Sequence, residues 1–344
     1  MNPIIWSILI TSLSTSSIIT LTSHHWMLAW LGLELNTLSI LPIIMKPHHP
    51  RATEATTKYF LIQTLAAAMI LFASTMNAWQ TGHWTITSSN TNTTIITVAI
   101  LLKLGIAPVH LWYPEIIQGT TLNTALLIST WQKIAPTALL YMMHNNLPTN
   151  LILVTGLLSA LLGGWAGLNQ TQTRKIMAHS SIAHMGWILT ALALNPQLTT
   201  TTLLIYITLT TATFFSLNNT TTKTITDMGT AWSTSPTMMT LTLLTLTSLG
   251  GLPPLTGFLP KLLILNELTL NSLLPLAIVI ALSSLPSLFF YIRLAHTTTL
   301  TAPPNTTNTE HKWRFKTSTI QNPTPMMTLA LMLLPLTPTL YNTT

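Results

Sequence analysis

The chain has 344 residues, of which 48% are hydrophobic and only 6% are charged. A soluble domain of this size carries roughly 25% charged residues, so an ordinary soluble enzyme is excluded. The net charge is +7 and there is no cysteine, which excludes disulfides, thiolate metal sites and iron–sulfur ligation within the chain. A basic excess suits nucleic acid, an anionic membrane surface or a bias in membrane topology, and topology fits so apolar a chain best.

Runs of about 20 largely uncharged residues predict helices that cross a bilayer, and the chain contains about eleven of them. In chain order they lie at 3–22, 26–45, 55–78, 92–112, 122–142, 148–168, 176–194, 198–217, 237–270, 274–294 and 324–342. The first run lacks a basic segment and a clear cleavage site, so we expect a retained helix rather than a signal peptide, and no import signal is visible. The sequence therefore predicts an all-α polytopic membrane protein.

The basic residues support this interpretation, because Lys and Arg collect in loops on one side of a membrane. Three of the thirteen lie inside predicted spans, and the others fall in or beside even-numbered connections. These others are Lys46, Arg51, Lys58, Arg174, Lys175, Lys223, Arg293, Lys312, Arg314 and Lys316. The pattern predicts an odd number of spans, with the N-terminus on the positive, inner side.

Four Glu or Lys residues lie well inside predicted spans, away from the span ends: Glu34, Lys103, Lys133 and Lys261. A charge near the bilayer centre costs about 2.5 to 3.5 kcal/mol, so these groups should face a protein interior or a water-filled cavity, where we expect some of them to exchange protons. The alternative is a static ion pair between Glu34 and a lysine that only locks helices together. One carboxylate cannot pair with all three lysines.

Two of these lysines stand beside residues that break helices. The breakers are Gly105 and Pro108 after Lys103, and Gly250, Gly251, Pro253 and Pro254 before Lys261. As a single helix the run 237–270 would reach roughly 50 Å against a hydrocarbon core of about 30 Å, so it must be broken or bent. Interrupted helices at membrane depth are tolerated where they line a cavity, and they supply ion sites in transporters.

The breaks also suggest a repeat. With five helices per unit, Lys103 and Lys261 each lie on the fourth helix of a unit, and the odd number makes the second unit inverted. We therefore expect a first antiporter-like repeat at 1–142, a second at 143–294, and a basic connection with a C-terminal helix at 295–344.

The histidines are weaker candidates. His110 follows the first break and His184 lies in the seventh span, where each could relay protons or simply pack. The pairs His24–His25 and His48–His49 lie in connections and do not have the spacing of three or four metal ligands, so we expect no metal site.

Four segments together resemble the antiporter-like membrane subunits of respiratory complex I. They are KLGIAPVHLWYPEIIQG (103–119), STWQKIAP (129–136), QTQTRKIMAHSSIAHMGW (170–187) and GGLPPLTGFLPK (250–261). The resemblance implies a fold with two inverted five-helix repeats. Members of this family have fourteen helices, and a shorter animal branch that lacks three N-terminal helices agrees with the eleven predicted here.

The resemblance also implies roles for the buried charges. Glu34 takes the place of the family's key glutamate, Lys103 and Lys261 of the lysines on the two broken helices, and Lys133 of the connecting lysine. The chain would then be a proton-translocating subunit of the inner mitochondrial membrane, with its N-terminus on the matrix side. The missing import signal fits synthesis within the organelle.

By the same resemblance, electron transfer from NADH to ubiquinone occurs in other subunits, so the chain is part of an enzyme but performs no redox chemistry itself. We expect NADH, FMN, iron–sulfur clusters and ubiquinone in partner subunits and no cofactor in this chain. The expected partners are other membrane subunits, including neighbouring antiporter-like ones, and lipids, but no nucleic acid. Two alternatives stay open: a stand-alone monovalent cation/proton antiporter, and a structural scaffold whose buried charges are static locks.

Overall fold

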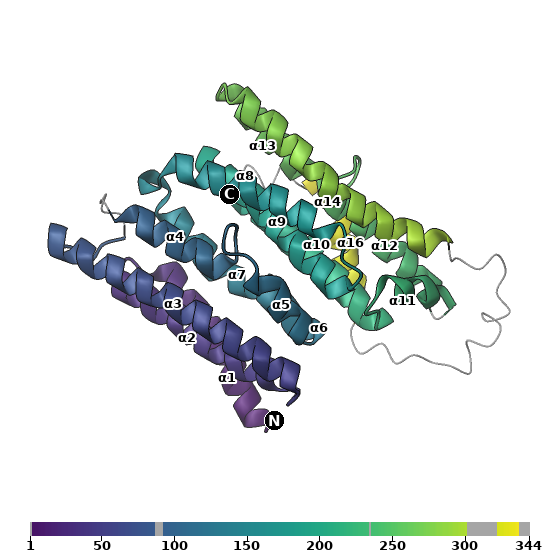
Figure 1. Cartoon of the computed structure of the whole chain (residues 1–344), viewed down its shortest axis with the longest axis horizontal. Helices are drawn as coiled ribbons and strands as arrows, with labels where there is room; N and C mark the ends of the chain where they lie inside the picture. The colour runs from purple at the N-terminus through teal and green to yellow at the C-terminus, as the bar shows by residue number, and fades with distance from the viewer. Residues whose placement is uncertain (1, 87–91, 234, 301–321, 337–344) are drawn as a thin grey trace. The chain divides into compact units, whose positions relative to one another are not determined.

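The computed structural model describes residues 2–86, 92–233, 235–300 and 322–336, and these are helical apart from short connections and isolated β-bridges (Figure 1). The residues form two compact units, Met1–Gly156 and Leu157–Thr344. The predicted repeat boundaries remain predictions. The basic residues Lys312, Arg314 and Lys316 and the end of the last predicted span lie outside the described residues.

The first unit contains seven helices and the start of an eighth among its described residues. They are α1 (Pro3–Thr22), α2 (Trp26–Met45), α3 (Pro50–Thr81), α4 (Thr93–Leu104), α5 (Trp112–Gly119), α6 (Leu122–Ser129), α7 (Trp131–Met142) and α8 (Thr149–Gly167). Helix α2 packs between α1 and α3, and α3 also contacts α4 and α5. The Nζ of Lys46, after α2, lies 4.5 Å from the ring of Trp6 on α1. The N-terminal end of α1 and the second connection therefore lie at the same end of the unit, as the charge pattern predicts.

Among its described residues, the second unit continues from α8 through seven further helices and two 3₁₀ turns. They are α9 (Thr173–Leu194), α10 (Pro196–Thr220), α11 (Ile225–Thr230), α12 (Pro236–Gly250), α13 (Phe258–Leu270), α14 (Leu274–Leu300) and α16 (Thr324–Met332), with the 3₁₀ turns Ala231–Ser233 and Leu334–Leu336. Helix α10 packs against α9, α12, α13 and α16, and α14 packs against α11, α12 and α13.

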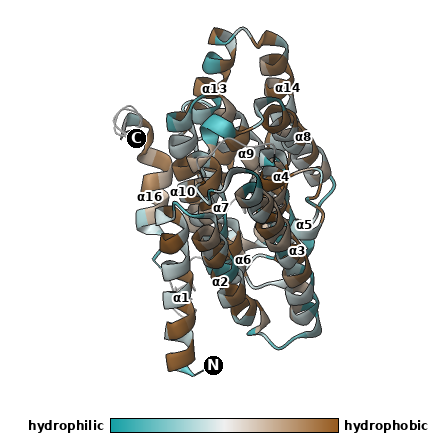
Figure 2. Cartoon of the chain, turned by 90° about the vertical axis from the view of Figure 1, so that its left-hand side faces the viewer, coloured by the Kyte–Doolittle hydropathy of each residue, from teal (hydrophilic) through white to brown (hydrophobic). Residues whose placement is uncertain are grey.

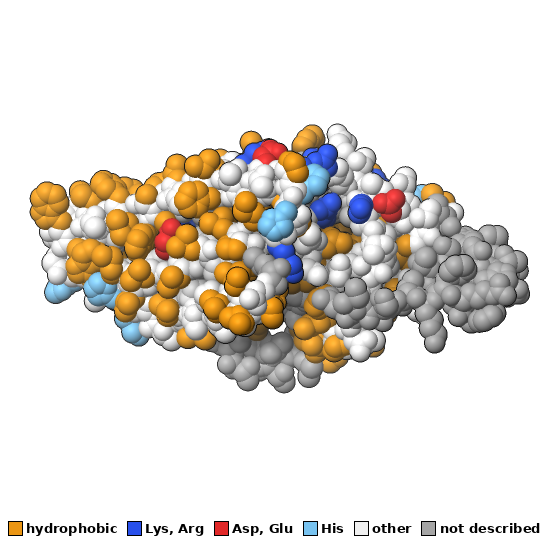
Figure 3. Space-filling view, turned by 90° about the horizontal axis from the view of Figure 1, so that it is seen from below, with side chains coloured by type: hydrophobic (Ala, Val, Ile, Leu, Met, Phe, Trp, Pro, Cys, Tyr) orange, Lys and Arg blue, Asp and Glu red, His pale blue; other side chains and the backbone are white. Residues whose placement is uncertain are grey.

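Seven of the described helices are long and apolar enough to cross a membrane: α1, α2, α3, α8, α9, α10 and α14. The other predicted spans correspond to shorter or interrupted helices, so the count of eleven stays a prediction. Figure 2 shows mainly hydrophobic residues along the helices, and Figure 3 shows few charged side chains on the face that it presents. On α1, Ile4, Ile8 and Ile18 are all more than half exposed. Such outward apolar faces suit a lipid environment.

The predicted span 237–270 is broken, as expected, into α12 and α13. The span 122–142, expected as one helix, is instead two helices that meet at Thr130. The hydroxyl of Thr130 donates to the carbonyl of Leu126, while the amide of Lys133 donates to the carbonyl of Thr130, three residues earlier. Pro136, which has no N–H, leaves the carbonyl of Gln132 without its helical donor. The donor lost at Pro136 and the three-residue bond at Thr130 accompany the interruption, and no glycine marks its position.

Threonine and serine are compatible with these helices because their hydroxyls bond within the helix. In α1, for example, the Thr20 hydroxyl donates to the Ser17 carbonyl and the Ser16 hydroxyl to the Leu13 carbonyl. At the start of α11, the Asp227 carboxylate accepts from the backbone N–H groups of Thr224 and Lys223. These bonds, that to Thr224 foremost, hold the pKa of Asp227 below its usual value.

Candidate functional site

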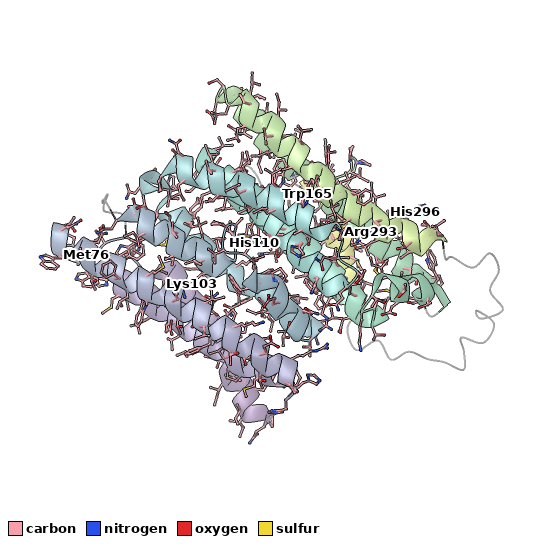
Figure 4. All side chains as sticks on the ribbon, viewed as in Figure 1. Met76, Lys103, His110, Trp165, Arg293 and His296 are labelled. Carbon is pink, nitrogen blue, oxygen red and sulfur yellow. The ribbon has the colours of Figure 1, made fainter. Side chains whose placement is uncertain are left out.

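The first unit contains a small cavity that two of the predicted lysines line. Lys103 stands in the last turn of α4 and is 7% exposed, and Lys133 stands in the first turn of α7 and is 3% exposed. Figure 4 labels Lys103 on α4. Each lysine thus lies next to a helix interruption, and the fold brings both to one polar space inside an apolar bundle.

The two ammonium groups have different surroundings. The Nζ of Lys133 lies 4.9 Å from the centre of the Tyr113 ring, within the range of a cation–π interaction. The Nζ of Lys103 is buried and has no hydrogen-bond partner among the described residues. Since an unpaired buried charge is costly, the charged form of Lys103 depends on the polar lining of the cavity.

That lining includes side chains that the sequence analysis missed. The amide of Gln132 donates to Asn36 over 3.0 Å, and the Tyr59 hydroxyl donates to Gln132 over 3.4 Å. The Gln63 amide donates to the backbone carbonyl of Lys103 over 3.3 Å. Tyr59 and Gln63 are four residues apart on α3 and so share one face of the helix. Polar residues at helical spacing inside an apolar span are the signal that could have identified them.

Glu34 lies on α2, partly buried, and its Oε2 has no hydrogen-bond partner among the described residues. Within the described ranges, no ion pair within 4.0 Å joins Glu34 to a lysine, whereas Lys58 pairs with Glu54 and Glu115. The static lock between Glu34 and a lysine is therefore absent from this part of the chain.

The second unit holds Lys261 and His184 in another small cavity. The Nζ of Lys261 donates to the carbonyl of Gly250 over 2.8 Å, and it lies 5.8 Å from the ring of Trp187. The ring of His184 is 5.7 Å from that of Tyr206, which also lines the cavity. The structure thus brings together two predicted residues from different helices, α9 and α13.

His110 is placed differently. It is 6% exposed and follows the first break, as Figure 4 shows, but it does not line the cavity of Lys103 and Lys133. Its Nδ1 lies 3.2 Å from the carbonyl of Pro108. The His110 side chain therefore contacts the backbone of the break and does not line the first cavity.

Both predicted breaks use the same backbone arrangement. Gly105 and Gly251 adopt left-handed conformations, with φ of 69° and 80°. The amide of each glycine donates to the carbonyl three residues earlier, and the next amide donates to the carbonyl five residues earlier, which is a Schellman ending. Pro108 and Pro254 follow each glycine by three residues. Aligned on these glycines, Lys103 precedes its break by two residues and Lys261 follows its break by ten.

Residues 23–286 match the family model described as the transmembrane region of NADH:quinone oxidoreductase/Mrp antiporter proteins, and residues 288–341 match that of the NADH dehydrogenase subunit 2 C-terminus. The chain is 51% identical to NADH-ubiquinone oxidoreductase chain 2 of Carassius auratus over 100% of both chains. It is 52% identical to that of Salmo salar over 98% of both.

Two solved structures resemble the fold. A chain of respiratory complex I from Thermus thermophilus has a TM-score of 0.80 at 24% identity, covering 95% of this chain and 78% of that one. A chain of the Mrp complex from Dietzia sp. has a TM-score of 0.76 at 18% identity, and the match covers 98% of this chain and 73% of that one. At such identities these matches establish the fold alone.

Proposed function

This chain belongs to the family of NADH-ubiquinone oxidoreductase chain 2, and from that premise we propose that it is a proton-translocating membrane subunit of respiratory complex I. The observation that carries the proposal is the buried amine of Lys103, which has no hydrogen-bond partner among the described residues and shares a polar cavity with Lys133. Groups of this kind inside a membrane protein are expensive and mark ion or proton pathways.

In the proposed mechanism, Glu34 biases the charge state of Lys103, and protons pass by way of Lys133. In the second unit, His184 and Lys261 share a cavity, and Lys261 exchanges protons with one side of the membrane. Lys103 and Lys133 carry protons and Glu34 acts through its charge. His110 is left out of this sequence because it lies outside the first cavity.

We further propose that the chain lies in the inner mitochondrial membrane, with its N-terminus on the matrix side, and contacts neighbouring antiporter-like subunits and lipids. It would bind no cofactor, with NADH, FMN, iron–sulfur clusters and ubiquinone bound by partner subunits. The stand-alone antiporter alternative has only the shared fold in its favour, whereas the full-length relatives at about half identity are chains of NADH-ubiquinone oxidoreductase.

The proposal is tested with Lys103→Met in membranes that contain the assembled complex. Methionine keeps the length and apolar packing of the side chain but cannot carry a proton. Proton output should fall about ten-fold or more, because a positioned proton-transfer group contributes at least that much to rate. Lys175→Met, which removes a charge at the start of α9, should pump normally. Unchanged proton output from assembled Lys103→Met complex would refute the proposed role.

A further inference from the structure

Helix α5 is a short helix between two interruptions, and two of its residues line the first cavity. It has eight residues, with the first break before it and a second interruption at 120–121 after it. Its residues Trp112 and Tyr113 line the cavity, and the Tyr113 ring faces the ammonium of Lys133. Since so short a helix is not stable alone, its contacts with neighbouring helices must fix it.

Several contacts join α5 to α3, and one is the edge-to-face contact of Tyr59 on α3 with Trp112 on α5, whose ring centres are 6.1 Å apart. At the end of α5, Gly119 lies so close to α3 that an added Cβ would be 2.8 Å from the Arg51 carbonyl and from the Ala55 side chain. One turn earlier, Glu115 accepts from the Nζ of Lys58 over 2.6 Å. Lys58 also donates over 2.6 Å to Glu54, on its own helix. Of the two ion pairs, only that of Glu115 crosses between helices.

The ion pair between Lys58 and Glu115 lies near the boundary between water and the hydrocarbon core of the membrane. Lys58 is the ninth residue of α3, about 12 Å along a helix that would be roughly 48 Å long, so it lies near the boundary of a core about 30 Å thick. Its side chain is 39% exposed, and that of Glu115 is 54% exposed. An ion pair at such a boundary is stronger than one in bulk water, because the surrounding dielectric constant is lower.

The position of Glu115 also corresponds to that of a predicted proton carrier. Glu115 follows Gly105 by ten residues, as Lys261 follows Gly251 by ten. In the second unit the charged side chain turns back and donates to the end of α12 at Gly250. In the first unit the Glu115 carboxylate instead accepts from Lys58. The end of α4 receives its bond from the Gln63 amide, which donates to the Lys103 carbonyl. Each half thus has an ionisable residue at the same step after its break.

We propose that Glu115 is a positioning residue for proton translocation, and that its ion pair with Lys58 holds α5 so that the Tyr113 ring stays against the ammonium of Lys133. The inference rests on the proposed function, since it assigns Glu115 a role in the same proton route. Glu115 itself does not touch the cavity and carries no proton in this account.

The test compares Glu115→Gln with Glu54→Gln in assembled complex. Both variants remove one carboxylate from Lys58, but only Glu115→Gln removes the ion pair between α3 and α5. We expect Glu115→Gln to lower the ratio of protons pumped to electrons transferred about two-fold, since the misplaced ring weakens one contact to Lys133 without abolishing it. Electron transfer should be unchanged, and Glu54→Gln should match the wild type. Glu115→Asp, which keeps the charge, should restore most of the ratio.

Three results would overturn the proposal. One is a normal ratio in Glu115→Gln, and another is an equal loss in Glu54→Gln. The third is failure of Glu115→Gln alone to assemble, which would make the ion pair a requirement for folding. If Lys103→Met loses pumping while Glu115→Gln does not, only the positioning role fails. If Lys103→Met pumps normally, the proposed function fails first.

Discussion

The contact between Lys261 and the break before it depends on the missing side chain of Gly251. The Nζ of Lys261 donates to the carbonyl of Gly250, where the C-terminal end of α12 attracts a cation. A Cβ built on Gly251 would lie 2.8 Å from that Nζ and 3.0 Å from the Cδ and Cε atoms. The glycine therefore makes room for the ammonium group.

Gly251→Ala should displace Lys261 and reduce the ratio of protons pumped to electrons transferred. The substitution also forces alanine into a left-handed conformation, at a cost of roughly 1–2 kcal/mol. Gly82→Ala is a matched control, since Gly82 has a φ of 73° but nothing within 4 Å of an added Cβ. Both variants should lose similar stability in thermal denaturation, and only Gly251→Ala should change the ratio. An equal ratio in the two variants would show that the contact with Lys261 has no part in pumping.

Among the helices, α8 shows how a charged side chain secures an element end. After α8 finishes at Gly167, the guanidinium of Arg293 on α14 donates to the carbonyls of Leu168 and Gln170 (Figure 4 labels Arg293). A planar guanidinium can serve two acceptors at fixed positions, which an ammonium group cannot do as well. Arg293 thereby holds the connection between α8 and α9 against α14.

Arg293→Lys should lower the stability of the assembled chain by about 1–2 kcal/mol, because one charge-assisted bond is lost. The measurement is the midpoint of thermal unfolding or of loss of assembled complex. Arg51→Lys, at the exposed start of α3, is the control and should leave the midpoint unchanged. A midpoint for Arg293→Lys equal to that of the control would contradict the role of Arg293.

Local signals predicted many elements. The ranges 3–22 and 26–45 coincide with α1 and α2, since long apolar runs fix helices in lipid, and glycine with proline marked both breaks. The interruption at Thr130 was missed because no glycine stands there and the donor lost at Pro136 lies six residues further along the chain. Element boundaries of this kind cannot be found from hydropathy alone.

For the whole molecule, sequence reasoning located the buried charges but not their surroundings. Three lysines in apolar spans were visible because their cost in lipid is large. That Lys133 faces Tyr113, or that Gln132 joins Asn36 to Tyr59, depends on how α2, α3, α5 and α7 pack. Such contacts join residues far apart in the chain, and no local pattern encodes them.

We propose that the buried lysines carry protons, and the measurement to make is on the Lys261→Ala variant. Proton pumping and electron transfer would be measured together in membranes, with assembly checked in the same sample. The account predicts a complex that assembles and pumps fewer protons per electron, because alanine cannot hold a proton at the end of α12. An assembled complex with the normal ratio would contradict the claim and favour a scaffold with static charges.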